Sequence, residues 1–308
     1  MLRLIVYRLL QLPVIVSVVF LVTFVLVWVI PGNPLENAES GKRPPPEVVE
    51  AMKRQYNLDN PWNFGTTYLK NVFTKGDFGP SLFYQDQKVS DIIGGSLPVS
   101  VQVGAAAMVV AVFLGTMAGV IGALKPGTFL DFSSMALTLV GVSLPNFVVG
   151  SLFLVVFATM LQWFPTGGWG RIDQVILPAI TLGLMPSAYI ARLVRLGLAD
   201  VMSSDFVRTA RAKGLSRNKA LFKHALKVAY LPVVSYLGPA TASVMTGSFV
   251  IEKVFNIPGM GEHFVNAVLN KDQFLILAVV LTYASMLVLF NLVVDIAYAW
   301  VDPRIDLS

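Results

Sequence analysis

The chain has 308 residues, of which 55% are hydrophobic and only 13% are charged, against about 25% charged in soluble domains, so it is expected to be an integral membrane protein with no long soluble domain. Its formal net charge of +5 lies mainly in one segment and does not indicate nucleic-acid binding. The absence of cysteine excludes disulfides and thiolate chemistry, and with only His224 and His263 to supply imidazole no metal site is expected.

The first predicted element is a membrane span from Leu9 to Ile30, preceded by Arg3 and Arg8. This uncharged run has about the 20 residues that cross a bilayer. It is longer than the apolar region of a typical signal peptide, and Pro31-Gly32 follows in place of a prompt cleavage site. We therefore predict an uncleaved first helix within residues 1–31, with the N-terminus inside.

Residues 32–97 form the one long polar segment, in which basic and acidic residues nearly balance. Loops of this length are translocated largely regardless of charge, so we place the segment outside. Two amphipathic helices are predicted in it, at 47–56 and 62–73. It is either a connector folded over the membrane domain or a docking surface for an external substrate-delivery protein.

Residues 98–308 carry five more predicted spans. The second span overall is uncharged and rich in Gly and Ala, which allows close helix packing. The third contains Leu144-Pro145-Asn146, where Pro145 removes a backbone donor. An interrupted span is tolerated only inside protein or beside a water-filled cavity, so Asn146 either lines a pathway or serves helix packing. The five spans are predicted at about 98–124, 132–163, 174–191, 228–251 and 274–294.

A basic segment, residues 192–227, separates the fourth span from the fifth. Each Lys or Arg at a bilayer centre costs about 2.5 to 3.5 kcal/mol, so this segment must lie outside the membrane. Ser204 is predicted to cap a first helix through Lys213, Gly214 to end it, and Ser216 to cap a second. Against Asp200 and Asp205 stand nine cations: Arg192, Arg195, Arg208, Arg211, Lys213, Arg217, Lys219, Lys223 and Lys227.

The second of these helices is predicted to be amphipathic. Four apolar residues share one face and three lysines share another: Leu221, Phe222, Ala225 and Leu226 against Lys219, Lys223 and Lys227. Because so short a helix pair has no core of its own, its apolar face needs the membrane domain or a partner protein. One interpretation is a basic loop held inside by its charge. A DNA-binding helix-turn-helix is disfavoured, because membrane spans begin within a few residues on both sides.

The basic segment contains Arg208-Thr209-Ala210-Arg211-Ala212-Lys213-Gly214-Leu215, followed by His224-Ala225-Leu226 and Leu231-Pro232. This pattern resembles the cytoplasmic EAA loop of ABC-importer permeases, in the form found in the peptide/nickel subfamily. Arg208 and Thr209 stand where Glu and Ala are usual, and the gap from Gly214 to Leu231 is longer; both departures are usual in the peptide subfamily. The resemblance implies that residues 208–215 dock in a groove on an ATP-hydrolysing subunit, where Ala210 and Gly214 let the two backbones approach.

Motifs that resemble the same subfamily cover nearly the whole chain. The implied fold is an all-α type I importer permease with six transmembrane helices, both termini cytoplasmic, in the bacterial inner membrane. Within the subfamily the likeness is greatest to oligopeptide permeases, and permeases for dipeptides, glutathione and nickel complexes remain alternatives. The motifs are Ser96-Leu97-Pro98-Val99-Ser100, Ser143-Leu144-Pro145, Gly247-Ser248-Phe249-Val250-Ile251-Glu252 with Pro258-Gly259, and Val294-Asp295 through Asp302-Pro303-Arg304.

No phosphate-binding loop of the form G-x-x-x-x-G-K-[ST] occurs in the sequence, so the chain is expected to be a non-catalytic subunit without a cofactor of its own. The resemblance implies two ATPase subunits that hold ATP and Mg, a homologous second permease subunit, an extracytoplasmic peptide-binding protein and surrounding lipid. The six apolar runs carry no ionisable residue of the kind a proton-driven carrier uses. Asp295 borders the last run and is expected to pair with a cation such as Arg304. The alternative from another class is a membrane-anchored sensor or recruitment protein without transport.

The segment Ile257-Pro258-Gly259 follows the fifth span and is expected at the outer mouth, as a gate or as a plain connector. A peptide pathway would be wide and lined by backbone and small polar groups. The candidates for such lining residues are Gln102, Asn146, Ser243 and Thr282.

Overall fold

The computed structural model describes residues 2–29, 45–84 and 87–301, and within these ranges the regular structure is helical apart from one isolated β-bridge between Pro80 and Lys88. The described residues divide into two compact units. The first unit comprises 2–5, 101–257 and 289–301, and the second comprises 6–29, 45–84, 87–100 and 258–288. Of the sequence motifs, Pro31-Gly32 and Asp302-Pro303-Arg304 lie outside the described residues, and so does the expected pairing of Asp295 with Arg304.

Four helices in the described ranges are long and apolar enough to cross a membrane. They are α1 (Leu2–Val29), α4 (Val89–Leu124), α7 (Ile172–Val201) and α13 (Gln273–Val301). A fifth span results if the helical stretch Arg217–Ala229 and α11 (Leu231–Val254), which meet at a bend of 52°, are taken together. The predicted first, second, fourth and sixth spans thus fall within long helices, but α4 starts before Pro98 and α7 continues past Ala191.

The predicted third span is divided into two pieces. α5 (Phe129–Ser143) ends before Leu144, and α6 (Asn146–Phe153) begins after Pro145 and continues into the π-helical η1 (Leu154–Met160). The break lies where the sequence predicts it, because Pro145 lacks an N–H and adopts an extended backbone at the start of α6. Neither piece reaches the about 20 residues that cross a bilayer, so helix length alone does not give six spans.

The core of the first unit lies where α4 packs on α7 and on the helical segment that follows Ser216. Glycines of α4 allow this close contact, as the sequence predicts. A Cβ atom on Gly115 would lie 2.6 Å from the Ser187 carbonyl oxygen, and one on Gly119 would lie 2.6 Å from that of Ala191. The buried cluster consists of Ala111, Val120, Ile190, Val194, Leu198, Val207, Ala220, Leu221, Ala225, Ala229 and Val233.

In the second unit, the two predicted amphipathic helices are present as α2 (Pro46–Tyr56) and α3 (Pro61–Lys75). Asn60 caps α3 by accepting hydrogen bonds from the first-turn backbone. On its inner side α3 buries Phe64 and Tyr68, and the ring of Phe64 meets that of Phe274 edge-on at a centroid distance of 5.0 Å. α12 (Met260–Asn270) completes the unit and begins with a hydrogen bond from the Met260 N–H to the Ser100 hydroxyl, at 2.9 Å.

Asp272, between α12 and α13, holds residues 81–83 in place. Its buried carboxylate accepts hydrogen bonds from the Ser81 hydroxyl and from the N–H groups of Leu82 at 2.8 Å and Phe83 at 3.1 Å. It also accepts the Leu275 N–H at 3.1 Å, which caps the first turn of α13. Burial raises the pKa of Asp272, and these hydrogen bonds act in the opposite direction. The sequence analysis did not single out this residue.

We expect Asp272→Ala to destabilise the second unit, because three buried donors and the partly buried Phe83 N–H would lose their acceptor, at about 1–3 kcal/mol for each buried donor left unsatisfied. The measurement is the midpoint of thermal unfolding in detergent. Asp272→Asn keeps one acceptor oxygen and should cost less. Asp59→Ala removes an exposed carboxylate and serves as the control; equal shifts for Asp59→Ala and Asp272→Ala would contradict the role assigned to Asp272.

Candidate functional site

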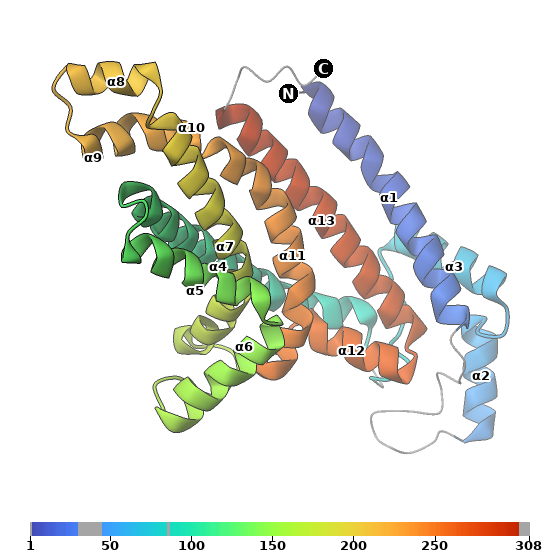
Figure 1. Cartoon of the computed structure of the whole chain (residues 1–308). Helices are drawn as coiled ribbons and strands as arrows, with labels where there is room; N and C mark the ends of the chain where they lie inside the picture. The colour runs from blue at the N-terminus through green and yellow to red at the C-terminus, as the bar shows by residue number, and fades with distance from the viewer. Residues whose placement is uncertain (1, 30–44, 85–86, 302–308) are drawn as a thin grey trace. The chain divides into compact units, whose positions relative to one another are not determined.

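The basic segment begins on a helix and not in a loop. α7 extends to Val201, so Arg192 and Arg195 stand on its last turns. A short turn then leads into α8 (Asp205–Ala212), which forms a hairpin with α9 (Arg217–Ala220) beyond the end of α7 (Figure 1). The sequence analysis ended the fourth span where the charges begin, but a helix can continue past the point at which it leaves the membrane.

The predicted break between the two short helices is confirmed. Gly214 has φ +93°, a left-handed conformation that favours glycine. Its N–H donates to the Arg211 carbonyl at 2.9 Å, and Ser216 caps α9 by accepting the Lys219 N–H at 3.5 Å. The predicted cap by the side chain of Ser204 is wrong, because its hydroxyl instead donates to the Val201 carbonyl at 2.6 Å.

The second helix of the pair is irregular. α9 passes into a π-helical turn, η2 (Leu221–Ala225), and then into α10 (Leu226–Ala229). Leu221 and Ala225 are buried in the core, whereas Phe222 is 59% exposed and lines an apolar cavity together with Leu226, so the predicted single apolar face is divided in two. That prediction assumed 3.6 residues per turn, and a π-helical turn holds more. Lys219, Lys223 and Lys227 are all exposed.

A single apolar side chain anchors α8. Val207 is completely buried in the core cluster that includes Val194 and Leu198 of α7 and Leu221 of η2. The guanidinium of Arg208 lies 3.7 Å from the Asp205 carboxylate, but this pair is exposed and contributes little. Of the predicted docking residues, Ala210 and Leu215 are partly buried and the others are exposed: Arg208, Thr209, Arg211, Ala212, Lys213 and Gly214.

An ion pair joins α7 to α5 near the same end of α7. Arg195 donates through Nε to Oδ1 of Asp131 at 2.7 Å and through Nη2 to Oδ2 at 2.8 Å. Asp131 is only 5% exposed and also accepts the Gly127 N–H at 3.0 Å. Sequence reasoning missed this acid, although one carboxylate at the start of an otherwise uncharged span was an available signal.

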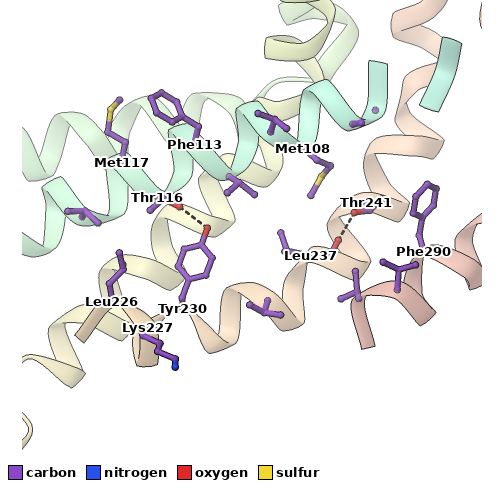
Figure 2. A pocket seen from close by; sticks show the side chains of 18 of the residues that line it. Met108, Phe113, Thr116, Met117, Leu226, Lys227, Tyr230, Leu237, Thr241 and Phe290 are labelled. Carbon is purple, nitrogen blue, oxygen red and sulfur yellow. Dashed lines mark hydrogen bonds between the residues drawn. The ribbon is translucent and has the colours of Figure 1, made fainter. Parts of the chain in front are cut away.

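An apolar cavity of about 1320 Å³ lies in the first unit between α4, α10, α11 and the last part of α13 (Figure 2). Met108, Phe113 and Phe290 line it. The hydroxyls of Thr116 and Tyr230 form a hydrogen bond of 2.9 Å within it. The cavity is therefore a place for apolar groups and offers few partners to the backbone of a peptide.

None of the four predicted pathway residues lines this cavity. Gln102 on α4 and Ser243 on α11 are exposed, and Asn146 is partly buried at the start of α6. Thr282 belongs to the second unit, where its hydroxyl donates to the Ala278 carbonyl at 2.7 Å. Their role in a substrate pathway stays a prediction.

The predicted outer gate lies at the end of α11. Ile257 is completely buried, and its N–H donates to the Glu252 carbonyl at 2.8 Å. Pro258 is exposed, and Gly259 is buried at the position that precedes α12. The segment therefore forms a tight turn, and its function as a gate remains a prediction. In the described ranges no three His, Asp or Glu side chains gather in a way that could hold a metal ion.

Comparison with known proteins gives matches over the whole length. Residues 111–307 match the family described as "Binding-protein-dependent transport system inner membrane component", and residues 1–104 match the N-terminal part of such membrane components. The chain is 43% identical to the oligopeptide transport system permease protein OppB of Salmonella typhimurium, over 99% of both chains. It is 42% identical to the dipeptide transport system permease protein DppB of Bacillus subtilis, over 95% of this chain and 94% of that protein.

Among solved structures, a chain of the MetNI methionine ABC transporter in an inward-facing conformation is similar in fold. The superposition has a TM-score of 0.54 at 16% identity and covers 68% of this chain and 96% of that one. At this identity the likeness concerns the fold alone.

We expect Val207→Asn to release α8, because a buried amide without partners costs about 1–3 kcal/mol. Trypsin should then cleave after Arg211 and Lys213 about tenfold faster in the detergent-purified chain, which corresponds to about 1.4 kcal/mol of local opening, in the lower half of that range. Thr209→Asn, on the exposed side of the same helix, is the matched control. An equal acceleration by both variants would mean that Val207 is not the anchor.

Proposed function

The chain belongs to the family of inner-membrane components of binding-protein-dependent transport systems, and on this premise we propose that it takes up oligopeptides as the permease subunit of an ATP-driven importer. The observation that carries the proposal is the identity of 43% to an oligopeptide permease over 99% of both chains. Dipeptide permeases are the second candidate, because one of them is 42% identical. Oligopeptides are favoured, since the match to the oligopeptide permease covers 99% of this chain and the match to the dipeptide permease covers 95%.

For the membrane topology we propose six spans with both termini in the cytoplasm. These are the four long helices, the α11 part of the bent pair, and α5 together with α6 and η1 as an interrupted third span. The break is tolerable because α6 packs on α7 and α11, with Val149 and Gly150 buried. This arrangement puts Lys125 and the whole basic segment on the cytoplasmic side, in agreement with the positive-inside rule.

The proposed coupling site is α8 with the turn that follows it, residues 208–215. Two separate ATPase subunits, which hold ATP and Mg, would each receive one such helix, the other coming from a homologous second permease subunit. The exposed cations of α8 are available for docking, and Val207 connects the helix to Val194 and Leu198 of α7. A displacement of α8 by the ATPase would therefore move α7. An extracytoplasmic binding protein would deliver the peptide from the other side.

Gly214 has two properties that suit a docking point. Its left-handed φ of +93° disfavours any residue with a side chain. In addition, apart from Gly214 itself and its two neighbours in the sequence, no heavy atom of the described residues lies within 4 Å of the position that a Cβ atom would take. The space beside Gly214 is thus open to the backbone of a partner.

Uptake by the reconstituted complex tests the proposed function. We expect proteoliposomes that contain this chain, a second permease subunit and two ATPase subunits to take up a labelled oligopeptide when its binding protein and ATP are present. Unlabelled oligopeptides should compete and dipeptides should not. Competition by dipeptides alone would favour the dipeptide alternative, and uptake without nucleotide would indicate a secondary carrier. Co-purification with one cytosolic effector and no uptake would indicate a sensor.

We expect Gly214→Val to uncouple the transporter while membrane insertion stays intact. A β-branched residue in a left-handed conformation costs about 1–2 kcal/mol, and its side chain would fill the open space at the docking point. If this cost weakens the docking of α8 on the ATPase subunit by the same free energy, peptide-stimulated ATP hydrolysis should fall by about tenfold. Gly76→Val, at φ +64° and also with open space around it, imposes the same backbone strain away from α8 and should leave hydrolysis unchanged. Normal stimulation in Gly214→Val would contradict the docking role.

A further inference from the structure

Arg195 differs from the other cations of the basic segment. Eight of the nine are exposed, whereas the side chain of Arg195 is only 33% exposed and makes two hydrogen bonds to one carboxylate. Its charge is therefore not available to a docking partner. Arg192, three residues earlier on the same helix, is exposed and serves as the comparison for a solvated cation of this segment.

The pair is built at the meeting point of three helices. Gly122 of α4 leaves the space for it, since a Cβ atom there would lie 2.9 Å from Oδ1 of Asp131 and 3.0 Å from Cδ of Arg195. Asp131 is in the first turn of α5 and also binds the N–H of Gly127 in the turn between α4 and α5. Arg195 thus fixes both the start of α5 and the preceding turn to α7.

We propose that the Asp131–Arg195 pair is a latch, through which a movement of the coupling helix α8 is passed from α7 to the turn between α4 and α5. This inference rests on the proposed function. α8 is anchored by Val207 in a cluster with Val194 and Leu198, and Arg195 lies between these two residues along α7. Force applied to α8 therefore reaches Arg195 within one helical turn. Arg195 and Asp131 are positioning residues, since neither touches the substrate or the nucleotide.

An ion pair at this place serves to fix the orientation of α5 relative to α7 more than to stabilise the folded chain. A buried ion pair is often no more stabilising than apolar side chains of the same size. Helices that pack through apolar side chains can slide along each other by small shear movements. A bidentate contact between guanidinium and carboxylate fixes the direction and register of both partners. The pair consequently opposes sliding of α5 along α7, which is what the transmission of a movement requires.

A distance measurement tests the latch directly. The chain has no cysteine, so spin labels need no prior cysteine removal and can be placed at Lys125→Cys in the α4–α5 turn and at Asp200→Cys at the end of α7, both exposed positions. In the assembled complex we expect one distance distribution with and without a non-hydrolysable ATP analogue. With Arg195→Lys, which keeps the charge and loses the bidentate fork, the distribution should shift or broaden when nucleotide binds. An unchanged distribution in Arg195→Lys, or a nucleotide-dependent change with the native pair, would overturn the proposal.

The ratio of peptide taken up to ATP hydrolysed separates transmission from stability. We expect Arg195→Lys and Asp131→Asn to lower this ratio by at least about fivefold, the lower end of typical coupling between sites. The exchange Asp131→Arg with Arg195→Asp should restore part of it, and Arg192→Gln should leave it unchanged. Uptake and hydrolysis that fall together, with the ratio preserved, would mean that the pair only stabilises the fold. If the wild-type complex takes up no peptide, the proposed function fails instead.

Discussion

The cost of placing charge in hydrocarbon determines the arrangement of residues 192–227, the basic segment. Nine cations between Arg192 and Lys227 keep this segment out of the bilayer, where each would cost about 2.5 to 3.5 kcal/mol at the centre. The segment is nevertheless too short to have a core of its own. It buries Val207, Ala220, Leu221 and Ala225 against α7. Charge therefore keeps the hairpin of α8 and α9 out of the bilayer, and apolar contact holds it against the end of α7.

The helix that receives this hairpin is also the one most enclosed by the rest of the chain. In its most apolar stretch, 61% of the residues of α7 are buried, against 11% for α1. α7 packs on α5, α6, α10 and α11, and all of these belong to the first unit. A movement that enters α7 at the end nearest Val207 is consequently shared by several helices at once.

The features that the sequence predicts well depend on local physics. Hydropathy locates the long helices, Pro145 locates the break in the third span, and the glycine at 214 locates the end of α8. Two local predictions were wrong. The π-helical turn that exposes Phe222 has no clear signature in the sequence, and the Ser204 hydroxyl can either cap α8 or donate to the Val201 carbonyl, as it does here. The carboxylates of Asp131 and Asp272 were not found because their partners lie 64 and up to 191 residues away in the sequence. A lone acid near an apolar run indicates that a partner exists, but only the fold identifies it.

These two acids show how the same group can serve different purposes. Asp272 is satisfied by a hydroxyl and by backbone N–H groups, so it fixes a turn to a helix start as a static anchor. The carboxylate of Asp131 accepts hydrogen bonds mainly from a guanidinium on another helix, so it connects α5 to α7. Two hydrogen bonds from Arg195 and one from the Gly127 N–H meet on this one carboxylate, so α5, the turn before it and α7 are connected at a single point. In the proposed latch, a change in what α8 touches would therefore reach α5 through Arg195.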